Sequence, residues 1–213
     1  MSLSNNEGVI IKKQIQFIMK KSFSILITSL LLIFTTNTFA QSSLEGILDK
    51  VVSLSGNSGN GSQVADLLGK GVSMLEQEAN TGGAEMKSKL LGQVGGLKNL
   101  IPLATSGKLN AGSLGKIVNT IKMLVAANRL KNMLGGGKSS LLGKGSAITS
   151  NLNLLQSASS VLGSGVSGQF SKLLSSTTKS VGKLDKSGLF GKLAAGATEK
   201  KLGKLVNLVS GAL

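Results

Sequence analysis

The chain has 213 residues, of which 41% are hydrophobic and only 3% aromatic, and it carries a net charge of +15 from 24 basic and 9 acidic side chains. It contains neither Cys nor His. These absences exclude zinc fingers, His-based catalytic triads, disulfide frameworks and haem or iron–sulfur ligation. Any interior must therefore be built mainly from aliphatic side chains.

The first 40 residues follow the pattern of a secretory signal peptide. Met19-Lys20-Lys21 precedes an apolar run from Phe23 to Phe34, and Thr38-Phe39-Ala40 places small residues at the −3 and −1 positions. This order of basic, apolar and small residues is typical of a signal peptide, and the run is shorter than the roughly 20 residues that span a bilayer. We expect cleavage after Ala40, with residues 1–18 as an upstream extension and Met19 as an alternative start.

The expected mature chain, residues 41–213, shows apolar stripes with helical spacing almost throughout. In the first stripe, for example, Leu44, Ile47, Leu48 and Val51 recur at three- and four-residue intervals, which is typical of an amphipathic helix. Such stripes predict helices at about 44–52, 64–75, 86–101, 113–134, 147–162, 166–184 and 189–209. No stretch alternates with the period of a strand. The sequence predicts an all-α single domain, an irregular bundle of six or seven short amphipathic helices.

Residues at the ends of these stripes predict where the helices begin and end. Ser42 with Glu45 has the pattern of a capping box, and Ser113 is the expected N-cap of the fourth helix. Pro102 is expected to end the third helix, and the glycines at 135–137 the fourth. Residues 55–62 contain only Gly, Ser and Asn, so we expect a flexible linker there.

Several glycines lie inside the predicted helices, where each costs about 0.8–1 kcal/mol relative to Ala. They are Gly69, Gly92, Gly115, Gly182, Gly191 and Gly203. Two interpretations are open: they are weak points in loosely packed helices, or they let helix axes approach closely.

Charge is distributed unevenly along the chain. Residues 41–85 carry six acids and two bases, whereas residues 86–213 carry 18 bases and two acids. Three interpretations are open: a solvated basic face, attraction to an anionic surface, or docking of the acidic segment on the basic remainder. The candidate contacts to an anionic surface are Lys116, Lys122, Arg129, Lys131, Lys138 and Lys144.

The composition of the basic segment bears on which anion it would bind. A single Arg among the mature bases and only two Phe argue against nucleic acid, which is read by Arg forks and aromatic stacking. Lys suits an anionic membrane surface or envelope polymer, because it acts as a point charge. Interfacial helices, however, usually carry aromatic residues, and these are scarce here.

Apparent catalytic motifs in the sequence are incomplete. The end of a phosphate-binding loop at 135–139 lacks its first glycine, because Asn132 occupies that position. Ser-x-x-Lys pairs begin at 113, 176 and 180, a number that chance alone explains, and Glu76 and Glu78 project from different sides of a helix. The sequence therefore predicts no catalytic, cofactor or metal site.

Taken together, these features predict an exported, non-catalytic structural or interaction protein of the cell envelope or exterior, located in the periplasm, at the cell surface or outside the cell. The alternative is a membrane-active or lipid-binding protein that uses its basic amphipathic helices.

Overall fold

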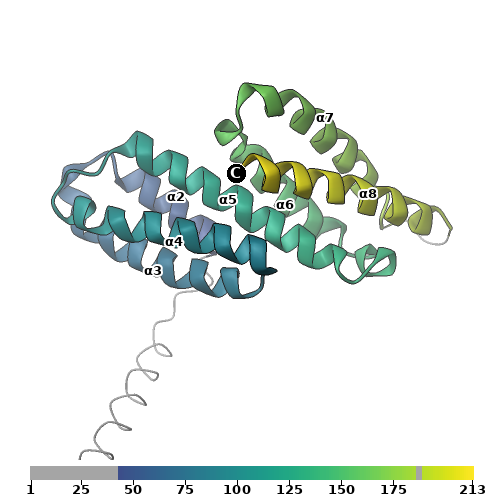
Figure 1. Ribbon diagram of the computed structural model, residues 1–213, viewed down its shortest axis with the longest axis horizontal. Coiled ribbons are helices and arrows are strands. Elements are labelled where there is room, and N and C mark those ends of the chain that lie inside the picture. Colours follow the sequence, from purple (N-terminus) through teal and green to yellow (C-terminus); the bar gives the residue numbers. More distant parts are fainter. Residues whose placement is uncertain (1–42, 186–188) are drawn as a thin grey trace, which may run out of the picture. The chain divides into compact units, whose positions relative to one another are not determined.

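The computed structural model describes residues 43–185 and 189–213, and within them it contains seven α-helices and no strand (Figure 1). The helices are α2 (Leu44–Leu54), α3 (Gly61–Asn80), α4 (Ala84–Thr105), α5 (Ala111–Leu134), α6 (Gly145–Ser157), α7 (Ser164–Val181) and α8 (Leu189–Ala212). Short 3-10 turns are η2 (Ser58–Asn60), η3 (Lys138–Leu141) and η4 (Ser159–Val161). The predicted all-α fold is confirmed, whereas the expected signal peptide and its cleavage point lie outside the described residues.

Helix α5 is shared by two groups of helices. On one side α3 and α4 form an extensively packed antiparallel pair, with α2 lying against α3 and α5 (Figure 1). On the other, α7 and α8 pack together, and α6 and α8 both contact α5. Because neighbours lie on opposite sides of α5, residues 121–128 of that helix are all buried. Helix α5 thus packs against both groups of helices, and its buried residues belong to the one hydrophobic core that both groups share.

The interior is almost entirely aliphatic. Leu48, Leu68, Leu75 and Leu97 have no exposed surface, and Phe170 is the only aromatic side chain in the described core. Burying each such side chain contributes roughly 1.5–3 kcal/mol. The leucine stripes of the sequence therefore face one another as predicted.

Two predicted helix starts were wrong by one and three residues. Helix α2 is capped by Ser43, whose Oγ accepts a hydrogen bond from the Gly46 N–H at 3.1 Å, and not by Ser42. Helix α5 is capped by Asn110, whose Oδ1 accepts from the Ser113 N–H at 2.9 Å. Asn caps a helix as well as Ser does, so each start has two suitable residues in the sequence, and the structure uses Ser43 and Asn110.

Pro102 does not end its helix. Helix α4 continues through it to Thr105, although proline has no N–H to donate to the carbonyl oxygen of Lys98. The chain reverses direction at Gly107, which has a φ of +68° that favours glycine.

The predicted end of α5 at Gly135 is confirmed. In the segment 55–62, η2 forms and α3 already begins at Gly61.

Close helix approach explains few of the helical glycines. A Cβ at Gly69, Gly92, Gly115 or Gly203 would meet no heavy atom within 4 Å, so the close-approach interpretation is wrong at those positions. It holds instead at Gly61, where a Cβ would lie 2.4 Å from the carbonyl oxygen of Ala104. The start of α3 therefore touches the end of α4 through backbone.

Candidate anionic-surface interface

Ion pairs fasten the acidic helices α2 and α3 to the basic helices α4 and α5. The partners are Glu45 and Glu78 with Arg129, Asp49 with Lys122, and Glu76 with Lys98. Arg129 Nη1 lies 2.5 Å from Glu45 Oε1, and its Nη2 lies 3.1 Å from Glu78 Oε2. This is the intramolecular docking of the acidic segment that the charge distribution suggested.

Two of the six predicted surface contacts are used inside the protein. The Lys122 side chain is only 9% exposed and is paired with Asp49, while the Arg129 guanidinium lies between two carboxylates. Lys122 belongs to the buried stretch 121–128 of α5, and Arg129 follows directly after that stretch. The positions that remain exposed are Lys116, Lys131, Lys138 and Lys144. Of the six predicted contacts, these four remain candidates for an external anion.

The part of the chain from residue 131 onward carries most of the basic side chains that lack an ion pair. The described residues from 131 onward hold ten lysines and two acids, Asp185 and Glu199, a net charge of +8. The exposed lysines are Lys131, Lys138, Lys144, Lys172, Lys179, Lys183, Lys192, Lys200 and Lys204. None of these nine has an ion-pair partner among the described residues. Charge left over after internal pairing is therefore concentrated on α7, α8 and the end of α5.

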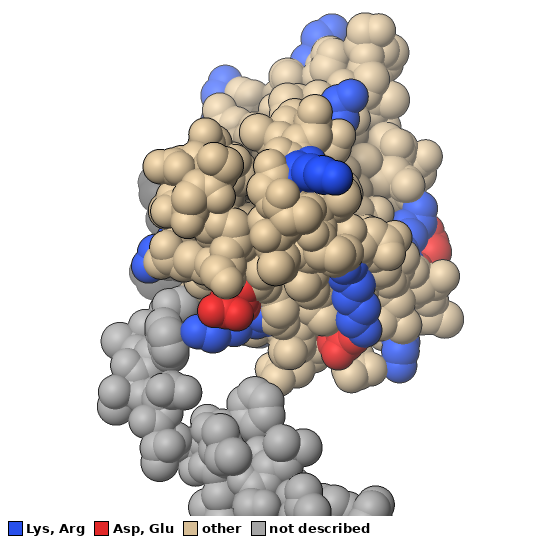
Figure 2. All heavy atoms as spheres, turned by 90° about the vertical axis from the view of Figure 1, so that its left-hand side faces the viewer, with Lys and Arg blue, Asp and Glu red and all other residues tan. Residues whose placement is uncertain are grey.

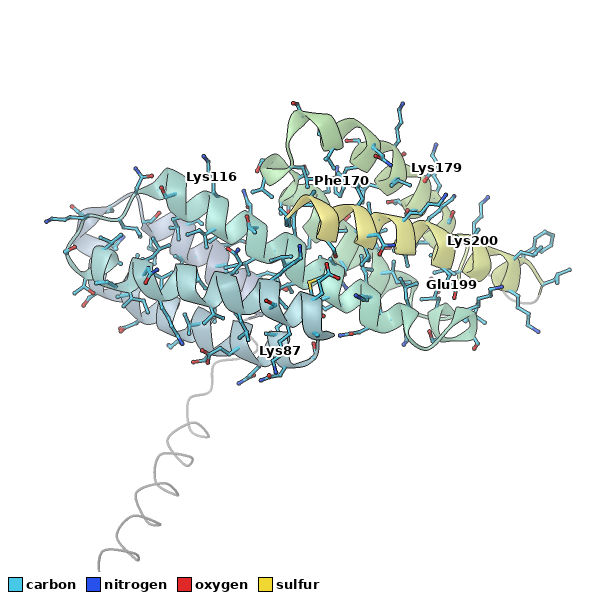
Figure 3. The ribbon with its side chains drawn as sticks, in the orientation of Figure 1. Lys87, Lys116, Phe170, Lys179, Glu199 and Lys200 are labelled. Atoms are coloured by element: carbon cyan, nitrogen blue, oxygen red, sulfur yellow. The ribbon has the colours of Figure 1, made fainter. Side chains whose placement is uncertain are left out.

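The figures show the contrast between paired and unpaired charge. On the face drawn in Figure 2, each group of acidic side chains lies beside a basic one. In Figure 3, Lys179 on α7 and Lys200 on α8 lie on the outside of their helices, while Phe170 lies among the helices. The outward lysines of α7 and α8 are free to meet a counter-charge in solution.

A shallow groove of about 800 Å³ runs between α7 and α8. Its lining residues are Gln169, Lys172, Leu173, Ser176, Lys204, Asn207 and Leu208. Lys172 on α7 and Lys204 on α8 lie on its two sides, and two leucines supply apolar surface between them. The groove thus combines two lysines with apolar surface from two leucines.

The start of α8 exposes three large apolar side chains. Leu189, Phe190 and Leu193 are 71%, 76% and 64% exposed, whereas the other exposed large hydrophobic side chains of the described residues reach at most 41%. The sequence predicts a helix over 189–209 but does not assign these three side chains to the interior or to the surface. The signal that could have placed them is that helical spacing puts them on the side of α8 that carries Lys200 and Lys204.

A serine and a lysine do meet, although not in a Ser-x-x-Lys motif. Lys201 Nζ donates to Ser180 Oγ at 2.6 Å and to the Ser176 carbonyl oxygen at 3.0 Å. Ser180 Oγ in turn donates to that same carbonyl at 3.1 Å, and Ser180 is only 8% exposed. A nucleophilic serine must direct its proton to a base and face a substrate. This pair does neither, and it ties the C-terminal turns of α7 to α8.

The other apparent motifs are likewise accounted for by helix ends and ion pairs. Lys138 and Ser139 follow a helix and lie in the 3-10 turn η3, whereas a phosphate-binding loop follows a strand. Glu76 and Glu78 pair with different bases, Lys98 and Arg129. Within the described ranges, no group of three or more carboxylates is placed to hold a metal ion. None of the helices described is both long enough and apolar enough to cross a bilayer.

Comparisons with known proteins add no relative: no family model, no curated protein and no solved structure matches the chain.

Proposed function

We propose that the chain is an exported, non-catalytic interaction protein of the cell envelope or exterior, which binds an anionic surface through the lysines of α7 and α8. The observation that carries this proposal is the net charge of +8 over the described residues from 131 onward, where nine exposed lysines lack an ion-pair partner. Export rests on the signal-peptide pattern of residues 19–40.

Internal pairing gives the basic surface a definite position. The acids of α2 and α3 face the bases of α4 and α5, so attraction within the chain cancels much of the charge there. On α7 and α8, Lys172, Lys179, Lys200 and Lys204 all project from one helical pair. Near an anionic membrane, each Lys contributes about 1 kcal/mol, and the attraction falls off within a Debye length.

The proposal is tested by removing positive charges at chosen positions and measuring how well the chain is retained on anionic beads. The exported chain is applied to beads coated with phosphatidylglycerol, with phosphatidylcholine or with poly-glutamate, at low and at high ionic strength. Replacing Lys172, Lys179, Lys200 and Lys204 by Gln should weaken retention on the anionic beads by about fivefold per lysine. High ionic strength should release the unmodified chain, because exposed charges are screened.

The matched control removes the same charge elsewhere. Lys50 is exposed on α2, Lys87 and Lys98 are exposed on α4, and Lys108 is exposed in the turn between α4 and α5. Their fourfold replacement by Gln should leave most of the binding intact. Equal losses in the two variants, or retention that ionic strength does not change, would contradict the proposal.

A specific observation favours a second candidate function. Leu189, Phe190 and Leu193 give α8 an exposed apolar end beside basic residues, which suits a lipid-binding protein. In that case the surface bound is a membrane rather than a soluble or cell-wall polymer, and binding to phosphatidylglycerol should exceed binding to poly-glutamate.

A further inference from the structure

We infer that the first turns of α8 insert into the headgroup region of an anionic membrane, with Leu189, Phe190 and Leu193 entering the lipid and nearby lysines contacting lipid phosphates. The inference rests on the proposed function and makes it specific, because it names both the anchor and the lipid.

The three apolar side chains form one face. Positions i, i+1 and i+4 of a helix lie within about a third of its circumference. The opposite face, with Gly191, Ala194 and Ala195, is buried. The apolar face is therefore fixed in place by a packed helix, but no described residue covers it.

The apolar face continues into a basic one along the same side of α8. Two further turns along that side, the exposed residues are Lys200 and Lys204. A helix that is apolar at its first turns and basic further along can place its end in lipid while its lysines remain at the headgroups. Along this side of α8, the apolar residues would thus lie at the level of the acyl chains and the lysines at the level of the headgroups.

Lysines also flank the apolar end itself. Lys192 is exposed within the same turns, and the side chain of Lys138 from η3 runs along α8, with its Cδ 3.7 Å from the position of a Cβ on Gly196. The acid closest in sequence, Asp185, has a carboxylate oxygen 2.7 Å from the Cβ position of Gly145, the first residue of α6. Its charge is directed toward that helix start, where the helix dipole favours it. The electrostatics around the apolar end therefore favour an anionic partner.

Aromatic side chains are the usual residues at the level of the headgroups. Residues 41–213 contain two aromatic side chains: Phe170 is buried, at 2% exposed, whereas Phe190 is 76% exposed. The scarcity of aromatic residues, which argues against a broad interfacial helix, is compatible with an anchor of one phenylalanine and two leucines.

A fluorescent reporter tests the insertion directly. The chain contains no Trp and no Tyr, so a Phe190→Trp variant reports on this position alone. With vesicles of equal parts phosphatidylglycerol and phosphatidylcholine, its emission should shift to shorter wavelength and be quenched by brominated acyl chains. A Leu103→Trp variant provides the matched control, because Leu103 is an exposed hydrophobic residue of α4, 40% exposed. It should show neither change.

A variant that lacks the three apolar side chains measures how much this face contributes to vesicle binding. Replacing Leu189, Phe190 and Leu193 together by Ser should weaken vesicle binding at least about tenfold, because each apolar side chain removed from water contributes to affinity. Circular dichroism should remain unchanged, since these side chains contribute little to the interior.

The outcomes separate this inference from the proposed function. If the unmodified chain and the triple Ser variant co-sediment equally with vesicles and the reporter does not shift, the insertion is refuted while binding through lysines stands. If the unmodified chain fails to bind the vesicles at low ionic strength, both are refuted. Concentration-dependent dimerisation that the triple variant abolishes, without a shift on vesicles, would show that a second copy covers the face and would overturn the inference.

Discussion

Lys122 and Asp49 join α5 to α2 by an ion pair whose two side chains differ greatly in exposure: 9% for the lysine and 63% for the aspartate. The buried Lys122 is therefore paired with an aspartate that remains largely in water. Removing Lys122 and removing Asp49 should lower the free energy of unfolding by different amounts.

Asp49→Ala should lower the free energy of unfolding by about 1–2 kcal/mol, because it leaves the buried ammonium of Lys122 without a carboxylate. Lys122→Met should change it by less than about 1 kcal/mol, since an apolar chain then fills the site and Asp49 stays hydrated. Urea unfolding followed by circular dichroism measures both. Asp66→Ala, at an exposed acid of α3, serves as the control, and a larger loss for Lys122→Met than for Asp49→Ala would contradict this account.

Arg129→Gln should be the most destabilising of the charge variants, by about 3–5 kcal/mol. It leaves Glu45 and Glu78, whose side chains are 17% and 13% exposed, facing each other without a cation. Chemical denaturation gives the value. Lys98→Gln is the matched comparison, because its pair with Glu76 is 55% and 43% exposed, and exposed pairs contribute at most about 1 kcal/mol. Similar losses in the two variants would show that the Arg129 cluster is not desolvated.

The same Gly-to-Ala change should have opposite signs at two positions of α3. Gly69→Ala should raise the free energy of unfolding by about 1 kcal/mol, because the site is open and Ala is the better helix former. Gly61→Ala should lower it, since the new Cβ would lie 2.4 Å from the Ala104 carbonyl oxygen. Thermal unfolding of the two variants compares them directly. Stabilisation by both would mean that the α3–α4 contact can open without cost.

Asn128→Asp should destabilise the protein by about 3 kcal/mol or more. Asn128 is fully buried, and its Nδ2 donates to Glu78 Oε1 at 2.8 Å and to Thr81 Oγ1 at 2.9 Å. An aspartate there would set a second carboxylate against Glu78 and remove the donor. Asn99→Asp, at an exposed position of α4, should change stability by less than about 0.5 kcal/mol. Equal values at the two sites would refute the buried network.

The sequence was sufficient to predict the helices because aliphatic stripes report directly which side of each helix is buried. Docking of the acidic segment on the basic one was one of three interpretations that the charge distribution left open, and the ion pairs support it. The sequence did not predict the individual partners: Asp49 and Lys122 are 73 residues apart, and Glu45 and Arg129 are 84 apart. Such pairings depend on how the helices cross, and periodicity contains no information about crossing.

The exposed start of α8 shows a second limit of the aliphatic stripes. Apolar residues stand on two sides of its first turns, and spacing alone does not show which side meets a neighbour. The buried side holds Gly191, Ala194, Leu202 and Leu205, whereas Leu189 and Leu193 lie on the opposite side with Lys200. Which side of a helix packs is a property of the assembled bundle.

The position of α5 has a consequence for how the molecule can be taken apart. Each group of helices packs against α5, and no single cut in the backbone yields two pieces that both contain α5. Cleavage by a protease at the exposed Gly135 or Gly136 would leave α5 in the N-terminal fragment. We expect the nicked protein to melt in a single transition, and the separated C-terminal fragment, which lacks α5, to regain structure only when it is mixed with the N-terminal fragment.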